Sequence, residues 1–419
     1  MPRTPSAAAA PAVATSSSSS SLPVPSLAAA TPDVSSSVEK PAAVADNTGS
    51  FHRQNFMARA ERLGDKTTNP QTLLNLVKQV RERIEIVHSS EYRNFLECYF
   101  PAFEKLLAVN VAPQFAECNL TRVRFIVLEI LNRLPSSELL KPYIVKLLRL
   151  TMSVLAVDNQ ENALVCLKII FSLHKNFRPL LREYVPEFLK FVQSLYSNLE
   201  ATRSTLFKMP LSAAQVASAS SALASEAAAG SSAVNQGQSA QSSDAPTSIN
   251  SANANVPPAS IEVSMKSTSS FKVLTECPLI VMLLFQLYPE HVRKHVKIFI
   301  PLMISALKLA PPNVSPDTPM PPIVRARFSE MVACQVKTLS FLTYLLKGFR
   351  QQMQPYEKVI ATAVVELLQR CPVKAVSTRK ELLVATRHIL ATDFRKGFFQ
   401  FVNILLNEDI LMGTGRQSK

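Results

Sequence analysis

Two histidines one helical turn apart are the first residues in this sequence that could do chemistry. His291 and His295 stand at positions i and i+4, the spacing at which two imidazoles can meet on one metal ion. Arg293, Lys294 and Lys297 surround the pair, and their charge opposes a bound cation. No third ligand accompanies the two histidines. We therefore interpret the pair as part of an exposed basic turn and predict no metal site.

Signatures of catalysis are missing from the 419 residues. There is no GxSxG elbow, HExxH zinc motif, GxxxxGK[ST] phosphate-binding loop or GxGxxG dinucleotide fingerprint. The six cysteines form no CxxC pair and stand in apolar runs, which is typical of reduced, buried thiols. They are Cys98, Cys118, Cys166, Cys277, Cys334 and Cys371. The sequence predicts that the chain is not an enzyme and that it needs no cofactor.

Basic residues are the remaining candidates for a functional site. The densest group lies in the first half of the chain, and it comprises Arg122, Arg124, Arg133, Lys141, Lys146 and Arg149. Such a group can receive an acidic peptide or a phosphate. It can equally be the solvated side of helices that bury their other face, and for any single residue we favour this reading. The second half raises the same question with Arg293, Lys294, Lys297, Arg379, Lys380, Arg387, Arg395 and Lys396.

The charge is unevenly divided along the chain. The net charge is +14, and residues 51–208 and 266–419 carry +7 and +11 of it, whereas 1–50 and 209–265 carry −1 and −3. A basic folded part with neutral tails indicates an acidic partner, either polypeptide or nucleic acid. Trp is absent and aromatic residues make up only 7% of the chain, which disfavours stacking platforms for single-stranded nucleic acid.

Two segments lack the large apolar side chains that a core needs. Residues 1–50 contain 31 Ser, Ala and Pro residues, and residues 209–265 contain no aromatic residue. Both are predicted to be disordered, the first as a tail and the second as a low-complexity linker. The foldable blocks are then 51–208 and 266–419.

Apolar residues recur at helical spacing throughout both blocks, and no strand pattern is evident. Helices are predicted over 72–88, 91–109, 120–134, 139–157, 159–177, 185–199, 271–288, 291–309, 331–349, 355–370, 379–390 and 394–406. Asp158 is the predicted N-cap of the helix over 159–177. The pattern that begins at Pro142 repeats at Pro186, an offset of 44 residues that is typical of HEAT and armadillo hairpins. The predicted fold is an all-α helical-repeat solenoid in two arrays.

Long strings of this sequence resemble a known family. They include RFIVLEILNRLPSSELLKPYIVKLLRLTMSVL, DNQENALVCLKIIFSLHKNFRP, FKVLTECPLIVMLLFQLY and RKELLVATRHILATDFRKGF. In this order they resemble the N-terminal region of the transformation/transcription domain-associated protein (TRRAP) family, pseudokinases among the phosphatidylinositol-3-kinase-related kinases. The resemblance covers roughly 70–200 and 270–415 and includes the position of the low-complexity segment between them.

The resemblance implies HEAT-like repeats and a nuclear, non-enzymatic scaffold of histone acetyltransferase coactivator complexes, SAGA-like and H4-acetylating. It implies acidic transcription activators and other subunits of those complexes as partners, and no membrane. The six basic residues of the first half are then tentative activator-binding residues. A basic helical repeat that binds nucleic acid directly is the alternative. Family members continue into FAT and kinase-like domains, so the resemblance also implies a fragment, a truncated gene product or a short isoform.

Overall fold

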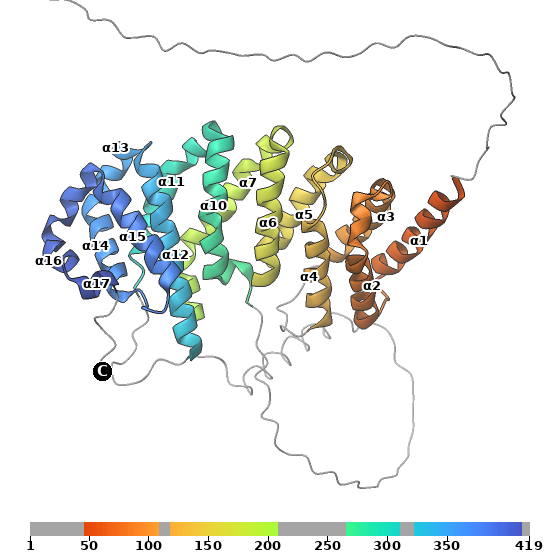
Figure 1. Ribbon diagram of the computed structural model, residues 1–419, viewed down its shortest axis with the longest axis horizontal. Helices are drawn as coiled ribbons and strands as arrows, with labels where there is room; N and C mark the ends of the chain where they lie inside the picture. Colours follow the sequence, from red (N-terminus) through yellow and green to blue (C-terminus); the bar gives the residue numbers. More distant parts are fainter. Residues whose placement is uncertain (1–45, 109–117, 208–264, 311–321, 413–419) are drawn as a thin grey trace, which may run out of the picture. The chain divides into compact units, whose positions relative to one another are not determined.

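The computed structural model describes residues 46–108, 118–207, 265–310 and 322–412, and every regular element in these ranges is a helix (Figure 1). The prediction of an all-α helical-repeat fold is confirmed. The predicted disordered segments lie almost wholly outside the described residues. Helix α1 (Asp46–Gly64) is an exception that the sequence reasoning missed, because it begins inside the predicted tail.

From residue 48 onward the described helices belong to one compact unit built of two layers. In the first layer each helix packs against the next, in the order α2 (Pro70–Glu82), α4 (Asn119–Asn132), α6 (Gln160–Asn176), α10 (Phe271–Leu287), α12 (Pro322–Leu346) and α15 (Val376–Leu390). The second layer comprises α3 (Tyr92–Ala108), α5 (Ile144–Val157), α7 (Val185–Ser197), α11 (Pro289–Leu307) and α14 (Glu357–Arg370). This arrangement is that of stacked helical hairpins.

Short elements complete the hairpins. The remaining α-helices are α8 (Leu199–Leu206), α13 (Arg350–Met353), α16 (Val402–Leu405) and α17 (Glu408–Met412). The 3₁₀ turns are η1 (Ile84–His88), η2 (Glu138–Tyr143), η3 (Arg178–Tyr184), η4 (Ser267–Ser269), η5 (Gln354–Tyr356) and η6 (Asp393–Phe401). Both η2 and η3 lead directly into a second-layer helix, α5 and α7 respectively, so the 44-residue sequence repeat corresponds to a repeated structural unit.

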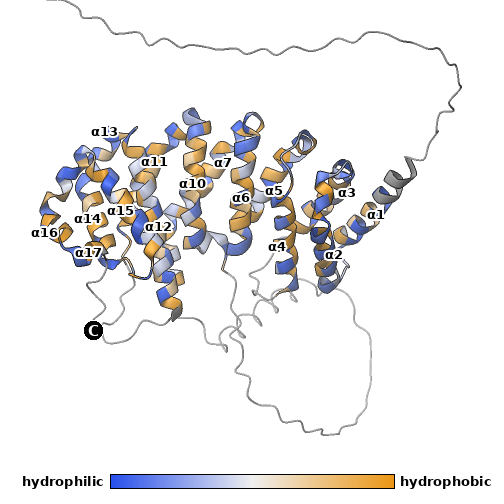
Figure 2. Cartoon of the chain, viewed as in Figure 1, coloured by the Kyte–Doolittle hydropathy of each residue, from blue (hydrophilic) through white to orange (hydrophobic). Residues whose placement is uncertain are grey.

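The core runs through both layers because the long helices of each layer bury apolar residues. Hydrophobic and hydrophilic residues alternate along these helices (Figure 2). The buried residues of α5 include Ile144, Leu147, Leu148, Thr151 and Leu155, which stand at the spacing of an amphipathic helix. Burying a large aliphatic side chain stabilises the fold by about 1.5–3 kcal/mol. A continuous apolar core between the layers therefore holds successive hairpins together.

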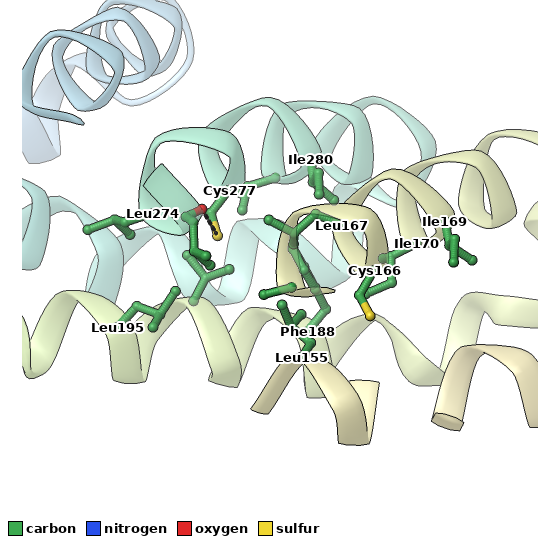
Figure 3. Packing of buried hydrophobic residues seen from close by; sticks show 14 of the residues in the cluster. Leu155, Cys166, Leu167, Ile169, Ile170, Phe188, Leu195, Leu274, Cys277 and Ile280 are labelled. Carbon is green, nitrogen blue, oxygen red and sulfur yellow. Dashed lines mark hydrogen bonds between the residues drawn. The ribbon is translucent and has the colours of Figure 1, made fainter. Parts of the chain in front are cut away.

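The two predicted arrays are separated in sequence but not in packing. Helix α10 packs against α6, and α11 packs against α7, across the low-complexity segment. Leu167 of α6, Phe188 and Leu195 of α7 and Leu274 and Cys277 of α10 lie in one buried cluster (Figure 3). The two predicted arrays therefore pack against each other as one run of repeats.

The residues that flank 208–264 on its two sides lie side by side. The hydroxyl of Thr202 donates to the carbonyl of Thr268 at 3.4 Å, and the ring centroids of Phe207 and Phe271 are 6.3 Å apart. The chain therefore leaves the repeat array at the end of α8 and re-enters it at the same place, before α10. An insertion between adjacent points of this kind does not break the stacking.

The re-entering chain is also hydrogen-bonded to the corner between α5 and α6. The Gln160 amide donates to the Met265 carbonyl at 2.9 Å, and the Ser267 amide donates to the Asp158 carbonyl at 2.8 Å. The predicted cap of α6 is wrong by one residue. Asn159 is the N-cap, and its side chain accepts from the Asn162 amide at 2.9 Å, because the Asp158 carboxylate is engaged elsewhere.

Candidate docking surface

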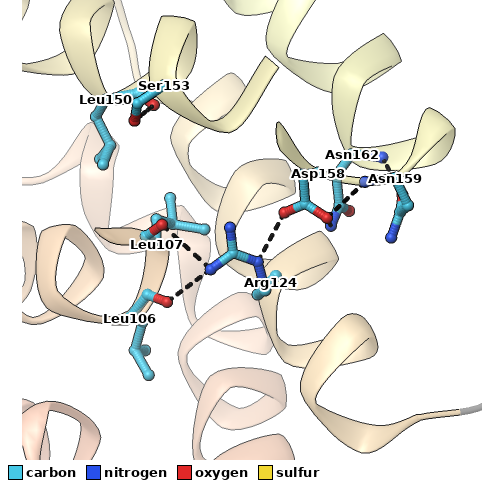
Figure 4. A network of polar contacts seen from close by, with 8 residues as sticks. All are labelled: Leu106, Leu107, Arg124, Leu150, Ser153, Asp158, Asn159 and Asn162. Atoms are coloured by element: carbon cyan, nitrogen blue, oxygen red, sulfur yellow. Dashed lines mark hydrogen bonds and ion pairs between the residues drawn. The ribbon is translucent and has the colours of Figure 1, made fainter. Parts of the chain in front are cut away.

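Arg124 does not belong to an exposed basic surface, and its prediction as an activator-binding residue is wrong. The side chain is only 1% exposed, inside the first hairpins (Figure 4). Its Nε donates to Oδ2 of Asp158 at 2.7 Å, and its Nη1 donates to the carbonyls of Leu106 and Leu107 at 2.9 and 3.2 Å. Those carbonyls end α3 and have no partner within their own helix. Arg124 thus caps one helix and ties it to the next hairpin.

Asp158 is the other half of this buried pair. Its Oδ1 accepts from the Asn159 amide at 2.7 Å and from the Asn162 side-chain amide at 3.1 Å, while Oδ2 binds Arg124. The carboxylate is 3% exposed, so its charge is neutralised by the guanidinium rather than by water. The corner therefore joins α3, α4, α5 and α6, together with the chain that re-enters at Ser267.

Two other buried polar side chains, farther along the chain, also donate to the carbonyls at the end of a helix. Gln335 of α12 is buried, and its Nε2 donates to three carbonyls at the end of α11: Ala306, Leu307 and Leu309, at 3.0, 3.2 and 3.0 Å. Arg379 of α15 is 7% exposed and donates to the carbonyls of Leu368, Cys371, Ile410 and Leu411. Arg379 is therefore a structural residue, not a surface cation.

The five other predicted basic residues are exposed, but the structure does not gather them into one patch. Arg122 and Arg133 lie eleven residues apart at opposite ends of α4, about 16 Å along its axis. Lys141 forms an ion pair with Glu138 in η2. Lys146 and Arg149 share one face of α5. The guanidinium of Arg149 lies 5.3 Å from the ring centroid of Tyr184 and hydrogen-bonds its hydroxyl.

A second basic region, at the seam between α7 and α11, was missed as a unit. Arg182 of η3 donates from Nε to Nε2 of His291 at 3.1 Å and forms an ion pair with Glu290. Gln193 of α7 is 3.0 Å from Nδ1 of His295. The partners are more than 100 residues apart in sequence. The two histidines are neighbours on a helix, as predicted, but they contact the preceding repeat.

Lysines complete the surface at this seam. Lys190 is exposed on α7, one turn before Gln193. Burial lowers the pKa of His295, and the positive charges of Lys190 and His291 lower it further. Lys294 is exposed, one turn after His291. Arg182, Lys190, His291, Lys294 and His295 are hereafter the seam cluster. In the part of the chain that the structure describes, no three His, Cys, Asp or Glu residues are placed to hold a metal ion.

Four of the six thiols are shielded from solvent in the folded chain. Cys166, Cys277, Cys334 and Cys371 are buried, whereas Cys118 is exposed and Cys98 half-buried, so the prediction of burial is correct for four of the six. Burial raises the pKa of Cys334 to about 12 and raises the pKa of Cys166 and Cys277 well above the usual range. No helix among the described residues is long and apolar enough to cross a membrane.

The fold and this surface define a class: a HEAT-type helical-repeat protein with basic side chains exposed across its hairpins. A family model described as the Tra1 HEAT repeat central region matches residues 327–419. This match confirms the resemblance to the family, which covers roughly 70–200 and 270–415.

Curated relatives are similar in sequence to most of this chain. It is 38% identical over 407 residues to a "probable transcription-associated protein 1" of Dictyostelium discoideum, with 87% of the chain covered. It is 31% identical over 355 residues to the human transformation/transcription domain-associated protein, with 84% covered. It is 30% identical over 374 residues to the SAGA complex/NuA4 acetyltransferase complex subunit Tra1 of Schizosaccharomyces pombe, with 85% covered. The chain belongs to the Tra1/TRRAP family and spans only 9–10% of the length of these relatives.

Proposed function

We propose that this chain is a non-enzymatic scaffold segment of a nuclear transcription coactivator, which docks acidic transcription activators on its basic helical-repeat surface. The relatives named as SAGA and NuA4 acetyltransferase complex subunits support the coactivator role. Partners would then include other subunits of such complexes. The segment falls in a HEAT-repeat region of the family rather than in its kinase-like domain, which supports a scaffold without catalysis.

The docking role is supported by one observation, the position of the net positive charge along the chain. The excess of +18 on residues 51–208 and 266–419 is confined to the blocks that contain the helical repeats. Arg122, Arg133, Lys146 and Arg149 project from those repeats. Charge of this kind steers an acidic partner toward the surface and increases its association rate. Docking is then completed when apolar side chains of the partner meet apolar side chains of the helices.

A fluorescence titration tests this function. We expect the chain to bind a labelled 20-residue peptide that alternates Asp or Glu with Phe or Leu, and to bind a version with Ser at the apolar positions more weakly. Because Lys146→Glu/Arg149→Glu removes steering charge, we expect about a threefold loss of affinity at low salt. Absence of binding by the wild-type chain would contradict the proposal.

A DNA competition in the same assay addresses direct nucleic-acid binding. The docking proposal predicts that a 20-base-pair duplex displaces the peptide poorly at physiological salt. Displacement by DNA with a steep dependence on salt would instead support nucleic acid as the partner, because phosphate contacts release counterions.

A further inference from the structure

The seam between α7 and α11 combines fixed positive charge with exposed apolar side chains. Segments η3, α7 and α11 together carry six Lys and Arg residues against three Glu residues, a net charge of +3. The six are Arg178, Arg182, Lys190, Arg293, Lys294 and Lys297, and the three are Glu183, Glu187 and Glu290. Of the three acids, Glu290 is already engaged by Arg182.

An apolar side chain lies at the end of this cationic face. Ile298 is 51% exposed and follows Lys294 and His295 by one helical turn, so it lies on the same side of α11. Leu180, which is 45% exposed, lies in η3 two residues before Arg182. Arg182 contacts His291, and Ile298 is seven residues farther along α11, about 10 Å. The seam therefore offers cations beside two exposed apolar side chains.

The contacts across the seam hold its geometry. Arg182 is hydrogen-bonded to both His291 and Glu290, and Gln193 is hydrogen-bonded to His295. Segment η3 and helix α7 are therefore each joined to α11. The surface also rests on buried apolar packing between α7 and α11. A partner would therefore meet a preformed surface, which lowers the entropic cost of binding.

We infer that the seam cluster, with Ile298, is the docking point for an acidic peptide that carries large apolar side chains. The inference rests on the proposed function and gives it a location that joins the parts of the chain on either side of residues 208–264. Carboxylates of the peptide would meet Lys190 and Lys294, and an apolar side chain would cover Ile298. A nucleic acid fits this surface less well, because its phosphates offer no apolar group to cover Ile298 or Leu180.

A matched pair of variants in the full chain tests the location. Lys190→Glu/Lys294→Glu reverses two exposed charges in the seam, and Lys380→Glu/Arg387→Glu makes the same change in charge on two exposed positions of α15. Using the labelled acidic peptide, we expect the seam variant to lose about tenfold or more in affinity, and the α15 variant to lose about twofold at most. Thermal melts of both variants establish that each remains folded.

Ile298→Ser provides a second, uncharged readout. We expect it to weaken the binding of the alternating acidic peptide about threefold or more. The affinity for the version with Ser at the apolar positions should stay unchanged. Equal affinity of the seam variant and the α15 variant would overturn the location while leaving the docking function in place. Failure of the wild-type chain to bind any acidic peptide would overturn both.

Discussion

Replacement of Arg124 by alanine is expected to lower the free energy of unfolding by about 3–5 kcal/mol, the usual cost of removing one member of a buried ion pair. The variant leaves the Asp158 carboxylate buried without its guanidinium and frees the carbonyls of Leu106 and Leu107 at the end of α3. Urea unfolding followed by far-UV circular dichroism measures the change.

Arg122 is the matched control, because it lies two residues away on the same helix and is exposed. Arg122→Ala should change the free energy of unfolding by about 0.5 kcal/mol or less. The double variant Arg124→Met/Asp158→Leu should lose less than the sum of the two single variants, since it leaves neither charge unpaired. Similar losses of unfolding free energy for Arg124→Ala and Arg122→Ala would contradict the stabilising role of the buried pair of Arg124 and Asp158.

His174 is expected to make the fold less stable as the pH falls. The imidazole is fully buried in α6, and burial lowers its pKa to about 4. The Tyr288 hydroxyl donates to the Arg178 carbonyl at 2.9 Å, so its oxygen can accept from Nδ1 of His174 at 3.4 Å. The ordinary pKa of histidine is about 6.5. The unfolded chain therefore takes up a proton at a pH where the folded chain does not.

The sign of the effect follows from this difference. The contribution of His174 is fully present above about pH 6.5 and is lost as the pH falls toward 4. Between pH 7.5 and pH 5 the loss amounts to about 2 kcal/mol. His174→Leu should remove this part of the pH dependence in urea unfolding, whereas replacement of the exposed His388 by Leu should retain it. Equal pH profiles for wild type and His174→Leu would contradict the assignment.

Much of the fold follows from helical spacing, but the role of Arg124 does not follow from its type. Leu120, Arg124, Val127 and Leu131 stand at i, i+4, i+7 and i+11, so Arg124 lies on the apolar side of α4. That spacing was a signal that the side chain is buried. Its partner Asp158 is 34 residues away, and only packing brings the two together. The pair therefore could not be predicted from local pattern alone.

The candidate site was predicted less well than the fold, for a related reason. The basic character of His291, Lys294 and Lys297 is evident from the sequence. Arg182, however, precedes its partner His291 by 109 residues, and Gln193 precedes its partner His295 by 102. A long low-complexity segment without aromatic residues indicates a division between arrays. The pairing of α6 with α10 across that segment depends on apolar faces that many other helices in the chain also present.

The helices on both sides of residues 208–264 form one array, and we propose that this array carries one docking surface. A protease site placed in this segment allows the purified chain to be cut there, and size-exclusion chromatography then reports whether the halves stay together. We expect a 1:1 complex that still binds the acidic peptide, and we expect Leu274→Asp, in the buried cluster shared by α6, α7 and α10, to separate the halves. Two independently eluting halves of the cut wild-type chain would contradict a continuous array.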